Sequence, residues 1–260
     1  MPRFAANASM MFTEVPFLDR FAAVAEAGFP GIEFLFPYDW PADAIGARLR
    51  ETGLVPALFN LPPGDWAAGE RGLAALPGRE DEFRHSLDRA MPYVEATGVR
   101  QLHVMAGITA GLDQDYARDV YLANLDWAAR QVRGHGLDLL IEPINPRDMP
   151  GYFLADLDQT ADVIREVGAP NLLLQFDIYH RQVTCGDVST ALWEHFALIG
   201  HVQVASVPDR AEPDSGELND SHVFRTLDAL NYRGWVGCEY RPLAGTVEGL
   251  GWFRRWREGR

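Results

Sequence analysis

The chain has 260 residues, of which 47% are hydrophobic and 23% are charged, and its formal net charge at pH 7 is −14. These values are typical of a globular protein and exclude a nucleic-acid or anionic-membrane partner, because both require a positively charged surface. They do not exclude a small anionic substrate, since the charge inside one cleft can differ from that of the whole chain.

The cysteines and the N-terminal residues indicate the compartment. Cys185 and Cys238 have neither disulfide-scaffold nor metal-ligand spacing around them, which fits a reducing environment. The first residues lack the apolar core of a signal peptide. No apolar segment approaches the ~20 residues that span a bilayer. We therefore expect a cytoplasmic protein with no membrane partner.

Short apolar segments alternate with amphipathic ones along the entire chain. We expect eight strands, near residues 3–7, 31–36, 54–60, 101–106, within 137–145, and near 172–177, 201–205 and 235–239. We expect a helix after each strand, near residues 17–27, 42–52, 79–97, 115–133, 157–167, 187–198, 221–230 and 246–256. This alternation predicts an α/β protein, a (β/α)8 TIM barrel that forms one domain over residues 1–260.

Four of the later strands carry an oxygen-bearing side chain at or near their carboxyl ends. These side chains are Glu142, Asp177, Gln203 and Glu239, and the intervals between them are 35, 26 and 36 residues. Each interval is about one strand–helix–strand unit of ~30 residues. Because barrel strands all end on the same face, the spacing predicts that the four side chains converge there.

Three converging carboxylates would repel one another and raise one another's pKa, and a divalent ion removes that problem. A ligand set made only of oxygens favours Mg²⁺ or Mn²⁺ over zinc. The alternative is a set of structural ion pairs that closes the barrel end. For a single carboxylate, the structural ion pair is as good an explanation as the metal. It is a poorer explanation for oxygen-bearing side chains on four consecutive strands.

Two further residues are candidates for substrate binding. His180, in the loop expected after the sixth strand, would donate to a substrate oxygen; the alternative is a cap of that loop. Arg210, in the long loop after the seventh strand, would pair with a substrate carboxylate; the alternative is an ion pair with nearby acidic residues. His201 fits the core better than a ligand position, and Glu33 falls inside the second strand, where we assign it no catalytic role.

Several segments together resemble the hydroxypyruvate isomerase family, within the xylose-isomerase-like barrels. They are Ile-Glu-Pro-Ile-Asn at 141–145, Asp-Ile-Tyr-His at 177–180, Gly-His-Val-Gln at 200–203 and Gly-Trp-Val-Gly-Cys-Glu-Tyr at 234–240, with 64–72 and 77–80 extending the match. The resemblance covers essentially the full chain. It implies one divalent metal held by Glu142, Asp177, Gln203 and Glu239, with Glu142 and Glu239 as the catalytic acid/base pair.

One segment departs from the usual pattern of that family. Residues 205–208 read Ala-Ser-Val-Pro and residues 213–217 read Pro-Asp-Ser-Gly-Glu, where the family usually has Ala-Asp-Asn-Pro and Pro-Gly-x-Gly-Glu. The variant is similar to the 2-oxo-tetronate isomerase branch, whose substrate is one carbon longer. This departure leaves the choice between a C3 and a C4 substrate open.

The hypothesis is therefore aldose–ketose isomerisation of a small anionic hydroxy-keto acid, for example hydroxypyruvate to 2-hydroxy-3-oxopropanoate, by proton transfer through an enediol. Schiff-base chemistry is excluded because the chain contains no lysine. Rival hypotheses are a 2-oxo-tetronate isomerase, a ketose 3-epimerase with the same metal and glutamates, and a sugar-acid binding barrel without catalysis. An endonuclease IV-like enzyme would need a histidine-rich zinc site and a basic face. Homo-oligomerisation stays open.

Overall fold

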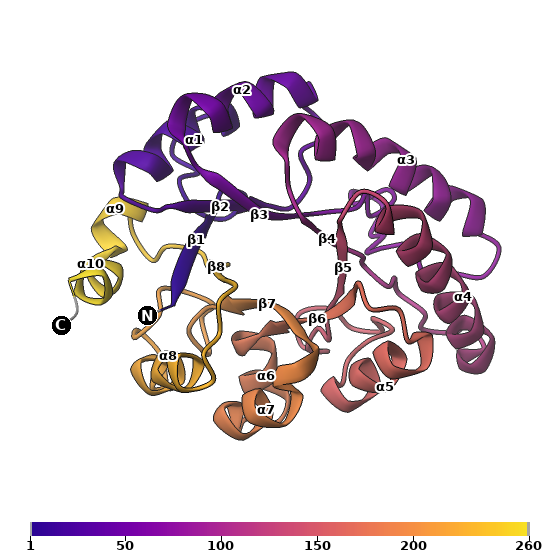
Figure 1. The fold of residues 1–260 in the computed structure, drawn as a ribbon. Coiled ribbons are helices and arrows are strands. Elements are labelled where there is room, and N and C mark those ends of the chain that lie inside the picture. Colours follow the sequence, from indigo (N-terminus) through magenta and orange to yellow (C-terminus); the bar gives the residue numbers. More distant parts are fainter. Residues whose placement is uncertain (1, 259–260) are drawn as a thin grey trace.

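Eight apolar segments form parallel strands that pair in sequence order and close into a barrel surrounded by helices (Figure 1). The computed structural model describes residues 2–258, so Met1, Gly259 and Arg260 of the expected 1–260 domain lie outside the described residues. The strands are β1 (Arg3–Asn7), β2 (Gly31–Phe34), β3 (Val55–Asn60), β4 (Gln101–His103), β5 (Asp138–Ile141), β6 (Leu172–Asp177), β7 (Ile199–Val204) and β8 (Trp235–Cys238). Pairing of β1 with β8 closes the barrel and confirms the predicted fold class.

The helices follow the strands and cover the outside of the barrel (Figure 1). They are α1 (Phe17–Glu26), α2 (Ala42–Thr52), α3 (Glu80–Thr97), α4 (Gln114–Arg133), α5 (Leu157–Val167), α6 (Ile178–Thr184), α7 (Val188–His195), a short 3₁₀ helix (Phe196–Leu198), α8 (Asp220–Ala229), α9 (Thr246–Gly249) and α10 (Gly251–Arg257). Within residues 2–258 no helix combines the length and the apolar character needed to cross a bilayer.

Aromatic rings fill much of the layer between the strands and the helices. Phe4 of β1 contacts Phe224 of α8 and Trp252 of α10 edge-on, each at 5.1 Å between ring centroids. Phe34 of β2 packs near Phe21 of α1, and both rings are fully buried. Each such side chain stabilises the fold by about 1.5–3 kcal/mol through burial. The outward-facing residues of the strands therefore pack in the core against the helices. A functional site can be formed only by the inward-facing residues and the loops.

The segment after β6 differs from the prediction. A helix was expected only from residue 187, but α6 starts at Ile178, directly after the strand. The carboxylate of Asp177 accepts a hydrogen bond of 2.7 Å from the backbone N–H of Tyr179, and it thereby caps the new helix. His180 consequently lies in the first turn of a helix and not in a loop. The prediction of a single last helix was also wrong, because α9 and α10 divide it.

Candidate active site

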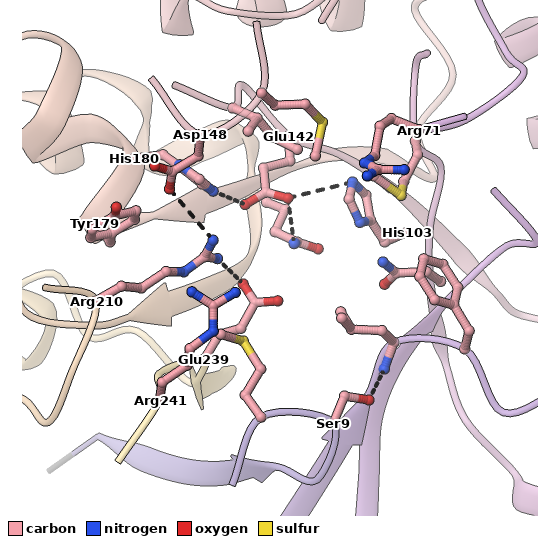
Figure 2. Close-up of a pocket in the computed structure, with 18 of the residues that line it drawn as sticks. Ser9, Arg71, His103, Glu142, Asp148, Tyr179, His180, Arg210, Glu239 and Arg241 are labelled. Atoms are coloured by element: carbon pink, nitrogen blue, oxygen red, sulfur yellow. Dashed lines mark hydrogen bonds and ion pairs between the residues drawn. The ribbon is translucent and has the colours of Figure 1, made fainter. Parts of the chain in front are cut away.

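A cavity of about 960 Å³ opens at the carboxyl ends of the strands, on the face predicted to carry the site (Figure 2). Glu142 lies one residue beyond β5 and Glu239 one residue beyond β8, so both carboxylates reach this face from the barrel rim. The cavity is also lined by residues of the loops after β1, β2, β3 and β7. It is therefore built from both halves of the chain.

Three of the predicted residues meet on one side of the cavity. Glu142, Asp177 and His180 each offer a ligand atom, and these atoms lie within 4.8 Å of one another. The Nε2 atom of His180 is 3.6 Å from the Asp177 carboxylate and 3.8 Å from the Glu142 carboxylate. All three side chains are buried. The sequence placed Glu142 and Asp177 together correctly, but it did not predict that His180 would be this close to them.

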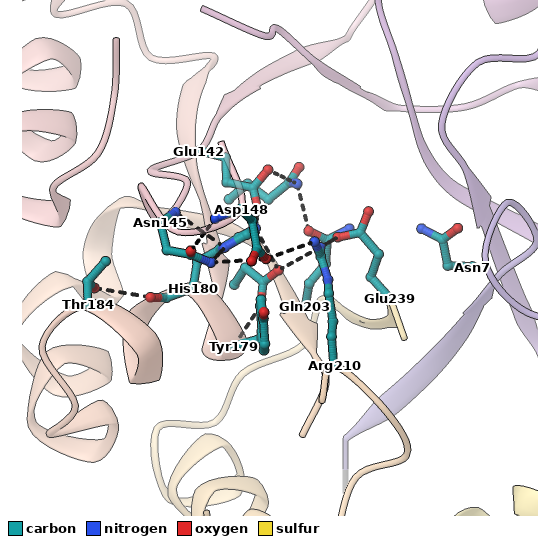
Figure 3. A network of polar contacts seen from close by, with 12 residues as sticks. Asn7, Glu142, Asn145, Asp148, Tyr179, His180, Thr184, Gln203, Arg210 and Glu239 are labelled. Carbon is teal, nitrogen blue, oxygen red and sulfur yellow. Dashed lines mark hydrogen bonds and ion pairs between the residues drawn. The ribbon is translucent and has the colours of Figure 1, made fainter. Parts of the chain in front are cut away.

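The guanidinium of Arg210 joins Glu239 to this cluster (Figure 3). Its Nη2 atom donates to Glu239 Oε2 at 2.8 Å and lies 3.6 Å from Asp177 Oδ2. A more distant contact of 3.8 Å joins its Nη1 atom to Asp148, and the guanidinium lies 4.9 Å from the Tyr179 ring centre. Arg210 thus contacts two of the predicted metal ligands and is not a surface ion pair.

Gln203 on β7 is the register partner of Asp177 on β6 and of Gly237 on β8. Its Oε1 atom accepts a hydrogen bond of 2.7 Å from the Gln175 side chain, and the same Gln175 amide donates to Glu142 Oε2 at 3.1 Å. Gln175 on β6 therefore links two of the four predicted ligands. The Nε2 atom of Gln203 donates to Glu33 Oε1 at 2.9 Å. These contacts fix the amide so that its oxygen faces the Gln175 side chain and its nitrogen faces Glu33.

Glu33 on β2 is fully buried inside the barrel, where three polar side chains donate to its carboxylate. Asn7 and Gln203 donate to Oε1 at 3.0 and 2.9 Å, and His201 Nε2 donates to Oε2 at 2.9 Å. A methyl group at Gly237 would collide with this carboxylate, which explains why the neighbouring position on β8 carries no side chain. The interpretation of His201 as a core residue agrees with these contacts.

The hydrogen bonds around His180 indicate which ring nitrogen carries the proton. The backbone N–H of Asn145 points at Nδ1 at 3.4 Å, and the Asn145 side-chain amide lies 2.6 Å from the same atom. A backbone N–H can only donate, so Nδ1 is an acceptor and the proton of a neutral ring resides on Nε2. Burial, and after it the positive charge of Arg210, lowers the pKa of His180 and keeps the ring neutral. Nε2–H therefore faces the carboxylates as a donor.

The carboxylates of the site are held in a way that disfavours their negative charges. Burial, and then the charges of Asp177 and Glu239, raises the pKa of Glu142 well above its ordinary value. Burial also raises the pKa of Asp177, and it raises the pKa of Glu239 to about 7, although Arg210 acts in the opposite direction on both. Glu142 Oε1 and Asp177 Oδ2 are buried without a hydrogen-bond partner among residues 2–258. A bound cation would supply the missing partner to both of these neighbouring carboxylate oxygens.

Several residues of the cavity were not predicted from the sequence. His103, at the end of β4, lies 3.6 Å from Glu142, and burial lowers its pKa to about 3, so it is neutral. Period-two alternation from Gln101 would have placed His103 on the interior face, but one histidine on one strand gave no pattern. Arg71 and Arg241 also line the cavity. Both belong to loops, where the sequence does not fix the direction of a side chain.

Comparison with known proteins identifies the family of this barrel. Residues 21–256 match the family described as xylose isomerase-like TIM barrel. A 2-oxo-tetronate isomerase of Cupriavidus necator is 56% identical over 98% of both chains, and the hydroxypyruvate isomerase of Escherichia coli K12 is 42% identical over 99% of this chain and 100% of that one. A crystal structure described as AP endonuclease, family 2 from Brucella melitensis is 50% identical, with a TM-score of 0.97 and coverage of 98% and 99%.

The chain belongs to the hydroxypyruvate isomerase family. Membership confirms the resemblance noted in the sequence, the xylose-isomerase-like barrel and the expectation of an isomerase. In this member of the family Glu142, Asp177 and His180 form one cluster, Arg210 connects Glu239 to it, and Gln175 connects Gln203 to it.

Proposed function

We propose that this protein is a divalent-metal-dependent isomerase that interconverts the keto and aldehyde forms of a short hydroxy-keto acid, hydroxypyruvate or its C4 homologue. The observation that carries the proposal is the convergence of buried carboxylates at the rim of the barrel. Glu142, Asp177 and Glu239 face one guanidinium, that of Arg210, so full ionisation leaves two negative charges uncompensated in the cluster. One Mg²⁺ or Mn²⁺ ion matches that charge and the oxygen donors.

The residues proposed to hold the ion are Glu142, Asp177, Gln203 and Glu239. The orphaned oxygens of Glu142 and Asp177 and the inward-facing oxygen of Gln203 support this ligand set. The tautomer of His180 argues against it as a ligand, because the nitrogen nearest the carboxylates carries a proton. We assign His180 to a substrate oxygen, toward which Nε2–H would donate. Arg210 keeps its proposed place beside the substrate and Glu239.

In the proposed mechanism, the two glutamates carry the proton between adjacent carbons. One carboxylate removes a proton from the carbon that bears the hydroxyl group, and the electron pair of that C–H bond forms the double bond of an enediol. The proton returns to the former carbonyl carbon, while the hydroxyl proton passes to the former carbonyl oxygen. A pKa of about 7 for Glu239 lets this carboxyl group exchange protons near neutral pH. When bound, the metal supplies Lewis-acid polarisation of the carbonyl group.

A C4 substrate, a 2-oxo-tetronate, is the second candidate, and two observations favour it. The segment 205–217 departs from the usual hydroxypyruvate isomerase pattern, and the 56% identical relative from Cupriavidus necator is a 2-oxo-tetronate isomerase. A DNA-repair function is not proposed, because the net charge of −14 opposes binding to a polyanion. A small anionic substrate and a cytoplasmic location complete the proposal.

The test is an isomerisation assay with hydroxypyruvate, a 2-oxo-tetronate and a neutral ketose, in the presence of Mg²⁺, Mn²⁺ or EDTA. We expect turnover of at least one acid, a loss of about 100-fold or more in EDTA, and recovery when the ion is returned. Activity confined to the neutral ketose would favour the epimerase hypothesis. Undiminished activity in EDTA would contradict the proposed dependence on a metal. Binding of the acids without turnover would favour a sugar-acid binding barrel without catalysis.

Solvent deuterium tests the enediol route separately. A proton carried by a buried carboxylate can exchange with solvent before it returns to carbon, so the product formed in D₂O is expected to carry deuterium at the carbon that receives the proton. Mass spectrometry of the product at low conversion measures this label. A product free of label after many turnovers would indicate a direct hydride shift between the two carbons.

A further inference from the structure

The cavity contains four arginines, although the chain as a whole is acidic. They are Arg71, Arg147, Arg210 and Arg241. A substrate carboxylate needs a guanidinium that is both oriented and free of an acidic partner, because a pair already formed with a protein carboxylate must be broken first. The four arginines differ in both respects.

Three of the four do not meet these conditions. Arg210 is paired with Glu239 and lies near Asp177. Arg147 donates to the hydroxyl group of Tyr179, lies 3.8 Å from Asp148 and is half exposed. Arg241 is exposed, and no hydrogen bond holds its guanidinium within residues 2–258, so binding would have to immobilise a flexible side chain.

Arg71 meets both conditions. Its Nη1 atom donates to the backbone oxygens of Trp66 and Glu70, at 3.0 and 2.7 Å, and its guanidinium stacks on the Trp66 ring at 3.8 Å from the centre. These contacts use one edge of the group and leave the edge formed by Nε and Nη2 for a ligand. Within the described part of the chain, Arg71 forms no ion pair with a carboxylate.

The loop that carries Arg71 is itself fixed. Glu70 accepts from the backbone N–H of Asp65 and pairs with Arg79 through two contacts of 2.7 and 3.3 Å. Gly72 bridges to Ala106 beside β4 at a φ of +115°, and a side chain there would collide with the Met105 carbonyl group. These contacts fix the backbone of segment 64–72, which is part of the family resemblance in the sequence, and they thereby hold the Arg71 guanidinium in place.

Figure 2 shows Arg71 on the His103 side of the cavity and Arg210 and Arg241 on the Glu239 side. We propose that Arg71 binds the carboxylate of the substrate and thereby selects acids over neutral ketoses. The inference rests on the proposed function, since it assumes that the hydroxy-keto end of the substrate lies between Glu142 and Glu239. The carboxylate end then extends across the cavity, toward the free edge of Arg71.

The test compares Arg71→Met with Arg241→Met, a matched removal of another cavity arginine. With the better acid substrate, Arg71→Met is expected to lower kcat/KM by about 100-fold, mostly through KM, because a charge-assisted bidentate contact is lost. Arg241→Met is expected to change kcat/KM less than about threefold. Where turnover of a neutral ketose is detectable, its kcat/KM is also expected to change less than about threefold in both variants. Guanidinium chloride is expected to restore part of the acid activity of Arg71→Ala.

Calorimetric binding of D-glycerate, a hydroxy acid without a keto or aldehyde group, separates this inference from the proposed function. We expect metal-loaded Arg71→Met to bind D-glycerate at least about 30-fold more weakly than the wild-type protein, whether or not that protein isomerises any acid. Equal binding in the two proteins would overturn the assignment. A similar loss for acid and neutral substrates would also overturn it, because it would mean that Arg71 only holds the loop.

Discussion

Replacing Glu239 by Gln is expected to lower kcat by about 10³-fold, which is within the range that one general acid/base group contributes. The amide keeps the shape of the side chain and an oxygen for the metal, but it neither removes nor returns a proton. The near-neutral pKa of Glu239 comes from burial opposed by the positive charge of Arg210. Steady-state kinetics with the preferred acid measures the effect.

The control for this variant is Glu217→Gln, an identical change at an exposed position of the segment between β7 and α8. It is expected to leave kcat within about twofold of the wild-type value. Calorimetric titration with Mn²⁺ measures the affinity of the variant for the ion. We expect Glu239→Gln to lose less in Mn²⁺ affinity than in kcat, since three other ligands stay in place. A variant that retains more than about a tenth of the wild-type kcat would remove Glu239 from the acid/base pair.

Replacing Glu33 by Leu is expected to destabilise the metal-free protein by about 3–5 kcal/mol, as for other buried charged networks that lose one partner. The change leaves the donors of Asn7, His201 and Gln203 without their acceptor inside the barrel. The removal of one buried negative charge offsets part of this loss. Urea unfolding of the wild-type and variant proteins in EDTA measures the difference in the free energy of unfolding.

Glu33→Gln is the matched control, because it retains an oxygen for Asn7 and Gln203. Its new amide group faces His201, whose Nδ1 atom has no partner within residues 2–258, so a shift of the ring proton to that atom can restore the contact. We expect less than half of the destabilisation of Glu33→Leu. If Glu33→Leu lowered the free energy of unfolding by less than about 1 kcal/mol, the hydrogen bonds to Glu33 would not be the main contacts that hold Gln203 in place.

The regular part of the molecule was predictable from the sequence. Period-two patterns fix which strand residues face the helices and which face the interior, and eight strand–helix units of this length leave a barrel as the natural closure. Glu142 and Glu239 were found because a carboxylate at the end of an apolar strand is costly unless something pairs with it. The same argument identified Asp177, whose additional role as the cap of α6 no periodicity indicated.

The contacts made by loop residues were not predictable in the same way. Arg210 was expected near the substrate, but its pairing with Glu239 depends on the path of the segment after β7. Arg71 depends in the same way on the segment after β3, whose course is set by a glycine packed on the Met105 carbonyl group. Glu33 was assigned no catalytic role, because two of the three side chains that donate to it, His201 and Gln203, come from β7, far from β2 in the sequence.

The central claim is that four side chains at the strand ends hold one cation. Anomalous diffraction from crystals of the protein grown with Mn²⁺ tests it most directly. The account predicts one strong peak in the cavity, coordinated by oxygens of Glu142, Asp177, Gln203 and Glu239, with His180 outside the coordination sphere. A peak held by Glu142, Asp177 and His180 while Gln203 and Glu239 stay away, or no peak at saturating Mn²⁺, would contradict it.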